Sequence, residues 1–171
     1  MGCSTPILDL IFLAYFVVHI PIAIFIDSQA IFPQWCYPKM FVDLITWYCS
    51  EFKDPMMVEP PAWFQSFVYC EILFQLPFFF VASYAFAKGI NQFPWIRTPM
   101  LIYGAHTATT TLAIAFHTFF HDFSESKHPG PATLHDRLML FSIYFPFFIV
   151  PVMLVVNFSF RSFSCEKVKR H

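Results

Sequence analysis

Residues 18–27 read VHIPIAIFID and end an apolar run that begins at Ile7. A helix that crosses a membrane needs about 20 mainly apolar residues, so the stretch 7–26 predicts a membrane-spanning helix. His19, Pro21 and Asp27 interrupt its apolar character. Ionisable side chains at membrane depth are costly, and they indicate a functional site.

The composition of the whole chain agrees with a membrane protein. Of 171 residues, 57% are hydrophobic, 21% are aromatic and only 12% are charged. A soluble domain has about twice this share of charged residues. The net charge of -1 offers no basic surface, which excludes nucleic acid as a partner.

Three further stretches are long and apolar enough to cross a bilayer: 63–86, 98–120 and 138–160. Only helices and closed barrels satisfy their backbone groups in hydrocarbon, and four segments cannot close a barrel. We therefore predict an all-α membrane protein, a bundle of four transmembrane helices in a single domain over residues 1–171. The first span is expected to be retained, because MGCSTP lacks the Lys or Arg of a signal peptide and no small-residue cleavage site follows.

Basic residues predict the orientation. Lys88 and Arg97 lie between spans two and three, and the tail 161–171 holds four more, whereas the loops on the other side are mainly acidic. The positive-inside rule then places both termini in the cytosol. The tail ends in EKVKRH, where Lys167 and Lys169 match a dilysine signal for return to the endoplasmic reticulum; an ordinary basic flank is the alternative. We expect the endoplasmic reticulum membrane as the location, with the nuclear envelope and other endomembranes as alternatives.

The loop after span one contains an amphipathic pattern. Apolar residues recur at helical spacing from Phe41 to Phe52, with charged residues elsewhere on the wheel. This predicts a short helix over the lumenal end of the bundle, or one lying on the membrane surface. Cys36 and Cys49 lie on the same side, so a disulfide is allowed but not required. The spacing of Cys and His residues predicts no metal or cofactor site.

Several polar side chains lie inside the predicted membrane spans. Glu71 and Gln75 lie four residues apart on one helix face, and His19 lies deep in span one. Such groups should face the bundle interior, because a carboxylate in hydrocarbon is costly unless it is paired, protonated or wet. For His106, His117 and the threonines of 107–111 we expect structural roles, with threonines bonding their own i-4 carbonyl. The remaining histidines are expected in solvated loops or the tail: His121, His128, His135 and His171.

Four prolines fall within the spans, and each removes one helical hydrogen bond: Pro21, Pro77, Pro146 and Pro151. The kinks that result can separate helices and open a cavity between them. A cavity with acids at its lumenal end and Phe, Ile and Leu walls would suit a lipophilic molecule that bears a cation.

Five stretches of the chain resemble one known family: VHIPIAIFID, EFKDPMMVEPPAWFQSF, CEILFQLPFF, WIRTPMLIYGAHT and TLHDRLMLFSIY. They are similar to the sigma-2 receptor branch of the EXPERA superfamily, which also contains the emopamil-binding sterol isomerase. The match runs from the first span to the tail, with one small length change near 90–93. The resemblance implies a four-helix fold in the endoplasmic reticulum membrane, a homodimer, and an occluded cavity that opens toward the bilayer.

The resemblance also implies a set of site residues. Asp27 would pair with the protonated amine of lipophilic ligands, Asp54 would support the site, and Glu71 would lie beside Asp27. His19 and Gln75 would form the polar lining. Family wall positions match Trp47, Phe52, Met57, Tyr103, Thr110 and Tyr144. The chain departs from the family at Phe147, where a tyrosine is usual, so one possible hydrogen bond to a ligand is absent.

Two classes of function follow. The favoured one is a receptor without catalytic residues that binds sterols or oxysterols and lipophilic amines; the family links it to the Niemann-Pick type C cholesterol transporter, to lipoprotein-uptake proteins and to cholesterol homeostasis. The alternative is a sterol double-bond isomerase, in which Glu71, Asp27 and His19 would supply acid–base chemistry. A pure scaffold ranks third, because buried acids would then cost stability without a function.

Overall fold

The computed structural model describes residues 6–124 and 127–163. Lys167 and Lys169 lie outside these residues, so the retrieval signal stays a prediction. Within the described residues the chain is entirely helical, without strands, which confirms the predicted fold class. The long elements are α1 (Pro6–Phe25), α4 (Ala62–Cys70) continued by the π-helical turn η3 (Glu71–Gln75) and α5 (Leu76–Lys88), α6 (Arg97–Phe120) and α7 (Leu134–Phe160).

Among the described residues, three continuous segments are both long and apolar enough to cross a membrane: Pro6–Ala30, Ala62–Lys88 and Leu134–Phe160. About a fifth of each apolar window is buried inside the protein (22%, 22% and 17%), so most of these apolar side chains face outward. Phe74 and Phe160, for example, are 72% and 82% exposed. Such an apolar exterior is stable in a lipid environment, and the protein is therefore a multi-span helical membrane protein.

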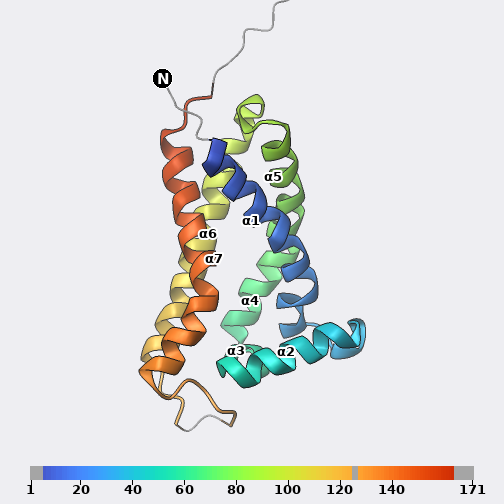
Figure 1. The fold of residues 1–171 in the computed structure, drawn as a ribbon, viewed down its shortest axis with the longest axis vertical. Coiled ribbons are helices and arrows are strands. Elements are labelled where there is room, and N and C mark those ends of the chain that lie inside the picture. Colours follow the sequence, from blue (N-terminus) through green and yellow to red (C-terminus); the bar gives the residue numbers. More distant parts are fainter. Residues whose placement is uncertain (1–5, 125–126, 164–171) are drawn as a thin grey trace, which may run out of the picture.

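Helix α6 is long enough to form the fourth span, with 24 residues, but its threonines and histidines make it more polar. It packs closely along α7 (Figure 1). At Gly104 a Cβ atom would lie 2.8 Å from Val155 Cγ2 and 3.0 Å from the Pro151 carbonyl oxygen. The absence of a side chain at Gly104 thus permits the close approach of the two helices.

The helices form two groups. α1 lies with α4 and α5 on one side, and α6 lies with α7 on the other; α2 (Lys39–Phe52) and α3 (Pro55–Val58) cross one end (Figure 1). The other end carries both ends of the described chain. There Arg161 binds Asp9 through two parallel contacts, Nη1–Oδ1 of 2.6 Å and Nη2–Oδ2 of 2.8 Å. Both ends thus lie on the same side, in agreement with an even number of crossings; which side is cytosolic stays a prediction.

An aromatic core fills the half of the bundle nearest the chain ends. Phe12, Phe16, Phe79 and Phe158 are completely buried there. Tyr103 is buried in the same cluster, and its hydroxyl lies 2.8 Å from that of Tyr15. Because this half is closed by large rings, the space for a ligand lies in the half nearer α2 and α3.

The structure contains the predicted amphipathic helix, and it begins the last span earlier than predicted. The amphipathic helix is present as α2, with Ile45 buried against the bundle. α7 begins at Leu134 rather than Leu138, because Thr133 and Asp136 form a capping box with hydrogen bonds of 3.1 and 3.2 Å. His135, which we expected in a solvated loop, therefore lies in the first turn of this helix.

Candidate ligand-binding site

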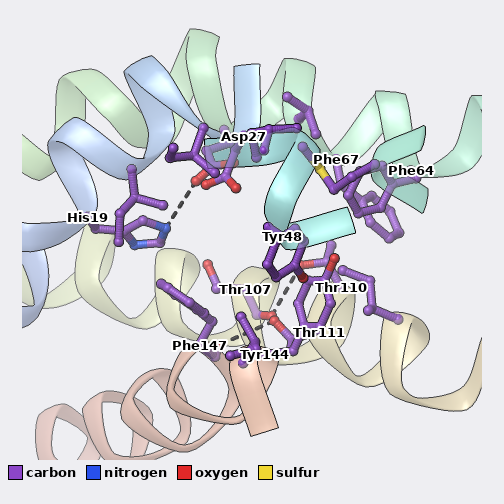
Figure 2. A pocket seen from close by; sticks show the side chains of 18 of the residues that line it. His19, Asp27, Tyr48, Phe64, Phe67, Thr107, Thr110, Thr111, Tyr144 and Phe147 are labelled. Atoms are coloured by element: carbon purple, nitrogen blue, oxygen red, sulfur yellow. Dashed lines mark hydrogen bonds and ion pairs between the residues drawn. The ribbon is translucent and has the colours of Figure 1, made fainter. Parts of the chain in front are cut away.

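A cavity of about 310 Å³ lies between the two groups of helices, in the half nearer α2 and α3. Its walls are mostly apolar, and polar side chains collect toward one end. Figure 2 shows His19 on one side of this space, Phe64 and Phe67 on the other, and Asp27 between them. The cavity mouth is marked by Leu44 and Trp47, which line it and are still 44% and 56% exposed.

Asp27 stands where the first span changes geometry. α1 ends at Phe25, and Asp27 opens the short 3-10 turn η1 (Asp27–Ala30). The carboxylate lines the cavity. One of its oxygens lies within 4.8 Å of a ring nitrogen of His19 and of a carboxylate oxygen of Glu71. Within the described part of the chain, no group donates a hydrogen bond to this carboxylate. Its acceptor capacity is available to a molecule in the cavity.

His19 and Glu71 form the neighbouring polar pair. The distance from His19 Nε2 to Glu71 Oε1 is 3.1 Å, and both side chains are largely buried. The imidazole ring stacks on Phe79, with centroids 4.6 Å apart, and contacts Phe147 at 4.8 Å. Its other nitrogen, Nδ1, is buried without a hydrogen-bond partner among the described residues. The rings therefore fix an imidazole that has one unused polar atom.

A π-helical turn, η3, presents Glu71 and Gln75 to the cavity. Pro77 follows in the first turn of α5, and a proline cannot donate the hydrogen bond that a regular helix needs at this position. Local π-helical turns are frequent at functional sites, because they change the direction of side chains within one helix. Here the π-helical turn interrupts the regular α-helix of span two where Glu71 is located.

The threonines of α6 divide into two groups. Thr109 Oγ1 donates to its own i-4 carbonyl, at 2.8 Å from the Ala105 oxygen, as expected. Thr107 instead donates to Gln75 Oε1 at 3.2 Å, and Thr111 donates to the Phe147 carbonyl oxygen at 3.2 Å. For these two the expectation was wrong, because a partner on a facing helix is within reach. They connect α6 to span two and to α7 across the cavity.

Asp54 has a different environment. Lys53 ends α2 in the left-handed conformation (φ 53°), and Asp54 then caps α3, accepting a hydrogen bond from the Met56 backbone N–H at 2.9 Å. Its second oxygen accepts from the Tyr48 hydroxyl at 2.9 Å and from the Tyr144 hydroxyl at 2.6 Å. Burial raises the pKa of Asp54, and these hydrogen bonds act in the opposite direction. The carboxylate thus joins α2, α3 and α7 behind the cavity wall.

The structure brings nine of the predicted site residues to the cavity: Asp27, Glu71, His19, Gln75, Trp47, Met57, Thr110, Tyr144 and Phe147. Three others lie elsewhere. Asp54 is fully buried behind Tyr48 and Tyr144, and Tyr103 belongs to the aromatic core. Phe52 stacks on Tyr48, with centroids 5.2 Å apart, and does not line the cavity.

Several lining residues were not predicted as site residues, including Tyr48, Phe64, Phe67, Val68, Thr107 and Thr111. A signal for part of this set was present in the sequence. Residues 64, 67 and 68 precede Glu71 by seven, four and three positions, which places them on the same helix face. Tyr48 carries a weaker signal, because its contact with Asp54 depends on the turn at Lys53.

The arrangement suits a lipophilic molecule with a positive charge. Apolar and aromatic walls would receive its body, and the carboxylates of Asp27 and Glu71 would accept charge-assisted hydrogen bonds from a protonated nitrogen. His19, Asp27 and Glu71 could also offer one ligand atom each to a metal ion. The rest of the lining is mostly apolar, so it matches a lipophilic organic cation better than a hydrated metal ion.

Comparisons with known proteins found matches over most of the chain. Residues 40–158 match the family described as EXPERA (EXPanded EBP superfamily). Over 151 residues the chain is 50% identical to "Sigma intracellular receptor 2" of Homo sapiens and of Macaca fascicularis, covering 86% of this chain and 84% of each relative. The protein of the same name from Xenopus tropicalis is 48% identical over 172 residues, 99% of both chains.

Proposed function

Since the chain belongs to the EXPERA family, we propose that it is an intracellular membrane receptor that holds sterols, oxysterols or lipophilic cationic amines in the cavity beside Asp27. The observation that carries the proposal is the free carboxylate of Asp27 at the polar end of an otherwise apolar cavity. A protonated amine would complete the hydrogen bonding of Asp27 and neutralise its charge in a low-dielectric setting, where such a contact is stronger than in water.

The apolar walls support the second ligand class. A sterol is a rigid hydrocarbon with one hydroxyl, and the cavity offers apolar side chains with Thr107, Thr110 and Gln75 among its polar atoms. Both ligand classes would occupy the same space and compete. The proposal includes the endoplasmic reticulum membrane, a homodimer, and a role in cholesterol homeostasis with the cholesterol transporter and lipoprotein-uptake proteins named above.

The second candidate function is sterol isomerisation. It is favoured by one observation: His19 and Glu71 lie 3.1 Å apart at the cavity, with Asp27 within 4.8 Å, so a proton donor and acceptor would both be available to a bound alkene. The receptor is preferred, because relatives at about half identity carry the name of a receptor over nearly the whole chain. The two carboxylates at the cavity are also what binding of a cation needs.

The test uses the purified full-length chain in detergent micelles. Saturation binding of a radiolabelled lipophilic amine should be specific, and an oxysterol should displace it competitively. Mass spectrometry of lipids extracted from the same preparation should recover a sterol. The chain should neither move the double bond of a sterol nor rescue cells that lack the sterol isomerase. Absence of saturable amine binding would overturn the receptor, and Glu71-dependent rescue would establish the isomerase instead.

A further inference from the structure

A second cavity, of about 400 Å³, lies at the end of the molecule that is remote from the described chain ends (Figure 1). Its lining comes from the end of α6, the loop that follows α6, and the segment from α3 to the start of α4. Met56 and Trp63 line this cavity, whereas the residues that follow them, Met57 and Phe64, line the cavity beside Asp27. The two cavities thus share a wall built from α3 and the start of α4.

Two histidines stack on each other in the second cavity. His117 lies in the last turn of α6, and His121 follows four residues later at the end of this helix. Their ring centroids are 4.4 Å apart, with the planes at 25°. Phe123 contacts both rings, at 5.4 and 4.8 Å, and Trp63 contacts His117 at 5.2 Å. The two imidazole rings therefore cannot separate without moving a neighbouring aromatic side chain.

The surroundings of the stacked pair disfavour positive charge. The free carbonyl groups at the C-terminus of a helix normally stabilise a cation there. Arg137 already occupies them, because its guanidinium donates hydrogen bonds of 2.9, 2.6 and 3.0 Å to the oxygens of Thr118, Phe119 and His121. Lys127 adds a second positive charge to the cavity lining. A protonated imidazole would therefore lie beside two fixed cations.

The nearby carboxylates have other partners. Glu59 Oε2 lies 3.7 Å from His128 Nε2, and Asp136 Oδ1 lies 2.9 Å from Lys53 Nζ. Asp122 accepts a hydrogen bond of 2.9 Å from the backbone N–H two residues later. In residues 6–124 and 127–163, no ion pair joins a carboxylate to either stacked ring. Protonation of the stacked pair is thus not compensated by a direct ion pair.

We propose that the His117–His121 pair senses the pH at this end of the molecule, and that its protonation lowers the ligand affinity of the cavity beside Asp27. Histidine is the side chain that normally changes charge between about pH 5 and 8. Above this range both rings are neutral and remain stacked. In acid, two like charges 4.4 Å apart repel each other, so the rings separate.

Trp63 connects this separation to the ligand cavity. Its ring contacts Phe67 at 5.6 Å and Phe64 at 5.9 Å, and both phenylalanines line the cavity beside Asp27. Movement of Trp63 therefore disturbs the wall against which the apolar body of a ligand packs. The effect on affinity rests on the proposed receptor function, whereas the response of Trp63 to pH does not.

The first experiment measures Trp63 directly. The variant Trp35→Phe/Trp47→Phe/Trp95→Phe leaves Trp63 as the single tryptophan of the full-length chain. Its fluorescence is followed in detergent micelles from pH 8 to pH 5. We expect the intensity to fall in a transition centred between about pH 5 and 7, because a protonated imidazole quenches a neighbouring indole more strongly than a neutral one does.

Three further variants assign this transition. Adding His117→Gln/His121→Gln to the single-tryptophan chain should abolish it. Adding His106→Gln/His135→Gln, which removes two histidines outside the second cavity, should preserve it. His128→Gln removes the third histidine of this cavity and should also preserve it. A transition that survives loss of the stacked pair, or that disappears in His128→Gln, would overturn the proposal.

A single substitution decides if the double variant fails to elute as a folded protein. His121→Gln changes an exposed side chain and leaves one titrating ring. Two interacting rings take up their protons in separate steps, so the wild-type transition should be broad. In His121→Gln it should narrow to the width of one independent group, and an unchanged width would overturn the pairing.

The second experiment measures affinity at pH 7.5 and pH 5.5 for a radiolabelled lipophilic amine that is protonated at both values. The cavity has titratable groups of its own, so His117→Gln/His121→Gln with all four tryptophans is the reference. Acid should weaken binding to the wild type by roughly fivefold more than binding to the reference, the lower end of typical coupling between sites. Equal losses would overturn the coupling. Absence of amine binding at both pH values would contradict the receptor function instead, and the Trp63 transition would then decide the sensor alone.

Discussion

Asp27 and Asp54 are both carboxylates in the half of the bundle nearer α2 and α3, but their surroundings differ. Asp54 is fully buried, and its two oxygens accept hydrogen bonds from the Met56 N–H, Tyr48 and Tyr144. Asp27 lines the cavity and accepts none from the described residues. A carboxylate whose hydrogen bonds are satisfied internally stabilises the fold, whereas one that is not satisfied is available to a ligand. Four predictions test this difference.

The largest effect is expected for Asp54→Ala. The substitution leaves two tyrosine hydroxyls and one backbone N–H without their acceptor, at a cost of about 3 kcal/mol or more in the free energy of unfolding. Asp27→Ala serves as the matched control. It should leave stability unchanged or raise it, because it removes an unsatisfied acid from apolar surroundings. Thermal unfolding of both variants in the same detergent measures the difference; equal losses would contradict the division of roles.

The second prediction concerns affinity. Asp27→Asn is nearly isosteric but removes the negative charge, so the affinity for a lipophilic amine should fall by about 100-fold, which corresponds to roughly 2.7 kcal/mol. Radioligand saturation on the purified protein measures this change. Asp43→Asn, at an exposed position on α2, removes the same charge outside the cavity and should bind the amine like the wild type. Unchanged binding by Asp27→Asn would contradict the ion pair.

The third prediction uses Cys49 as a reporter of the Asp54 charge. Burial, and secondarily the nearby Asp54 carboxylate, raise the pKa of the Cys49 thiol to about 12. The thiol therefore stays protonated near pH 8, and alkylation, which needs the thiolate, should be at least roughly tenfold slower at Cys49 than at the exposed Cys36.

The rate at Cys49 should continue to rise as the pH increases from 8 to 10. Asp54→Asn should accelerate it by removing the neighbouring negative charge. Mass spectrometry of single-cysteine variants follows the reaction. A plateau of the Cys49 rate below pH 9 would contradict the raised pKa.

The smallest effect is expected for Phe147→Tyr. This change restores the hydroxyl that is usual in the family, on a ring that lines the cavity 4.8 Å from the His19 ring. One added hydrogen bond contributes about 0.5–1.5 kcal/mol, so amine affinity should rise between about twofold and tenfold. Phe145→Tyr, at an exposed position on the same helix, is the control and should have no effect on binding. A loss of affinity for Phe147→Tyr would mean that the cavity has no room for the hydroxyl.

The sequence alone determined much of this protein. The apolar runs defined the helices that cross the membrane, because the length of each run and the demand for internal hydrogen bonds depend only on local composition. His19, Asp27 and Glu71 were identifiable because an ionisable residue is conspicuous within such a run. The apolar run did not predict the start of α7, because the helix begins at Leu134, four residues before the run, where Thr133 and Asp136 form a capping box.

Only the tertiary structure decided how the polar groups are paired. Asp54 meets Tyr144 across 90 positions of the chain, and Thr111 reaches the Phe147 carbonyl oxygen on a facing helix. It also placed Tyr103 in the aromatic core and Phe52 behind the cavity wall, although both lie on helices that contribute to the cavity. The reason is physical: helix periodicity fixes which residues share a face, but the partner of that face depends on the packing of distant segments.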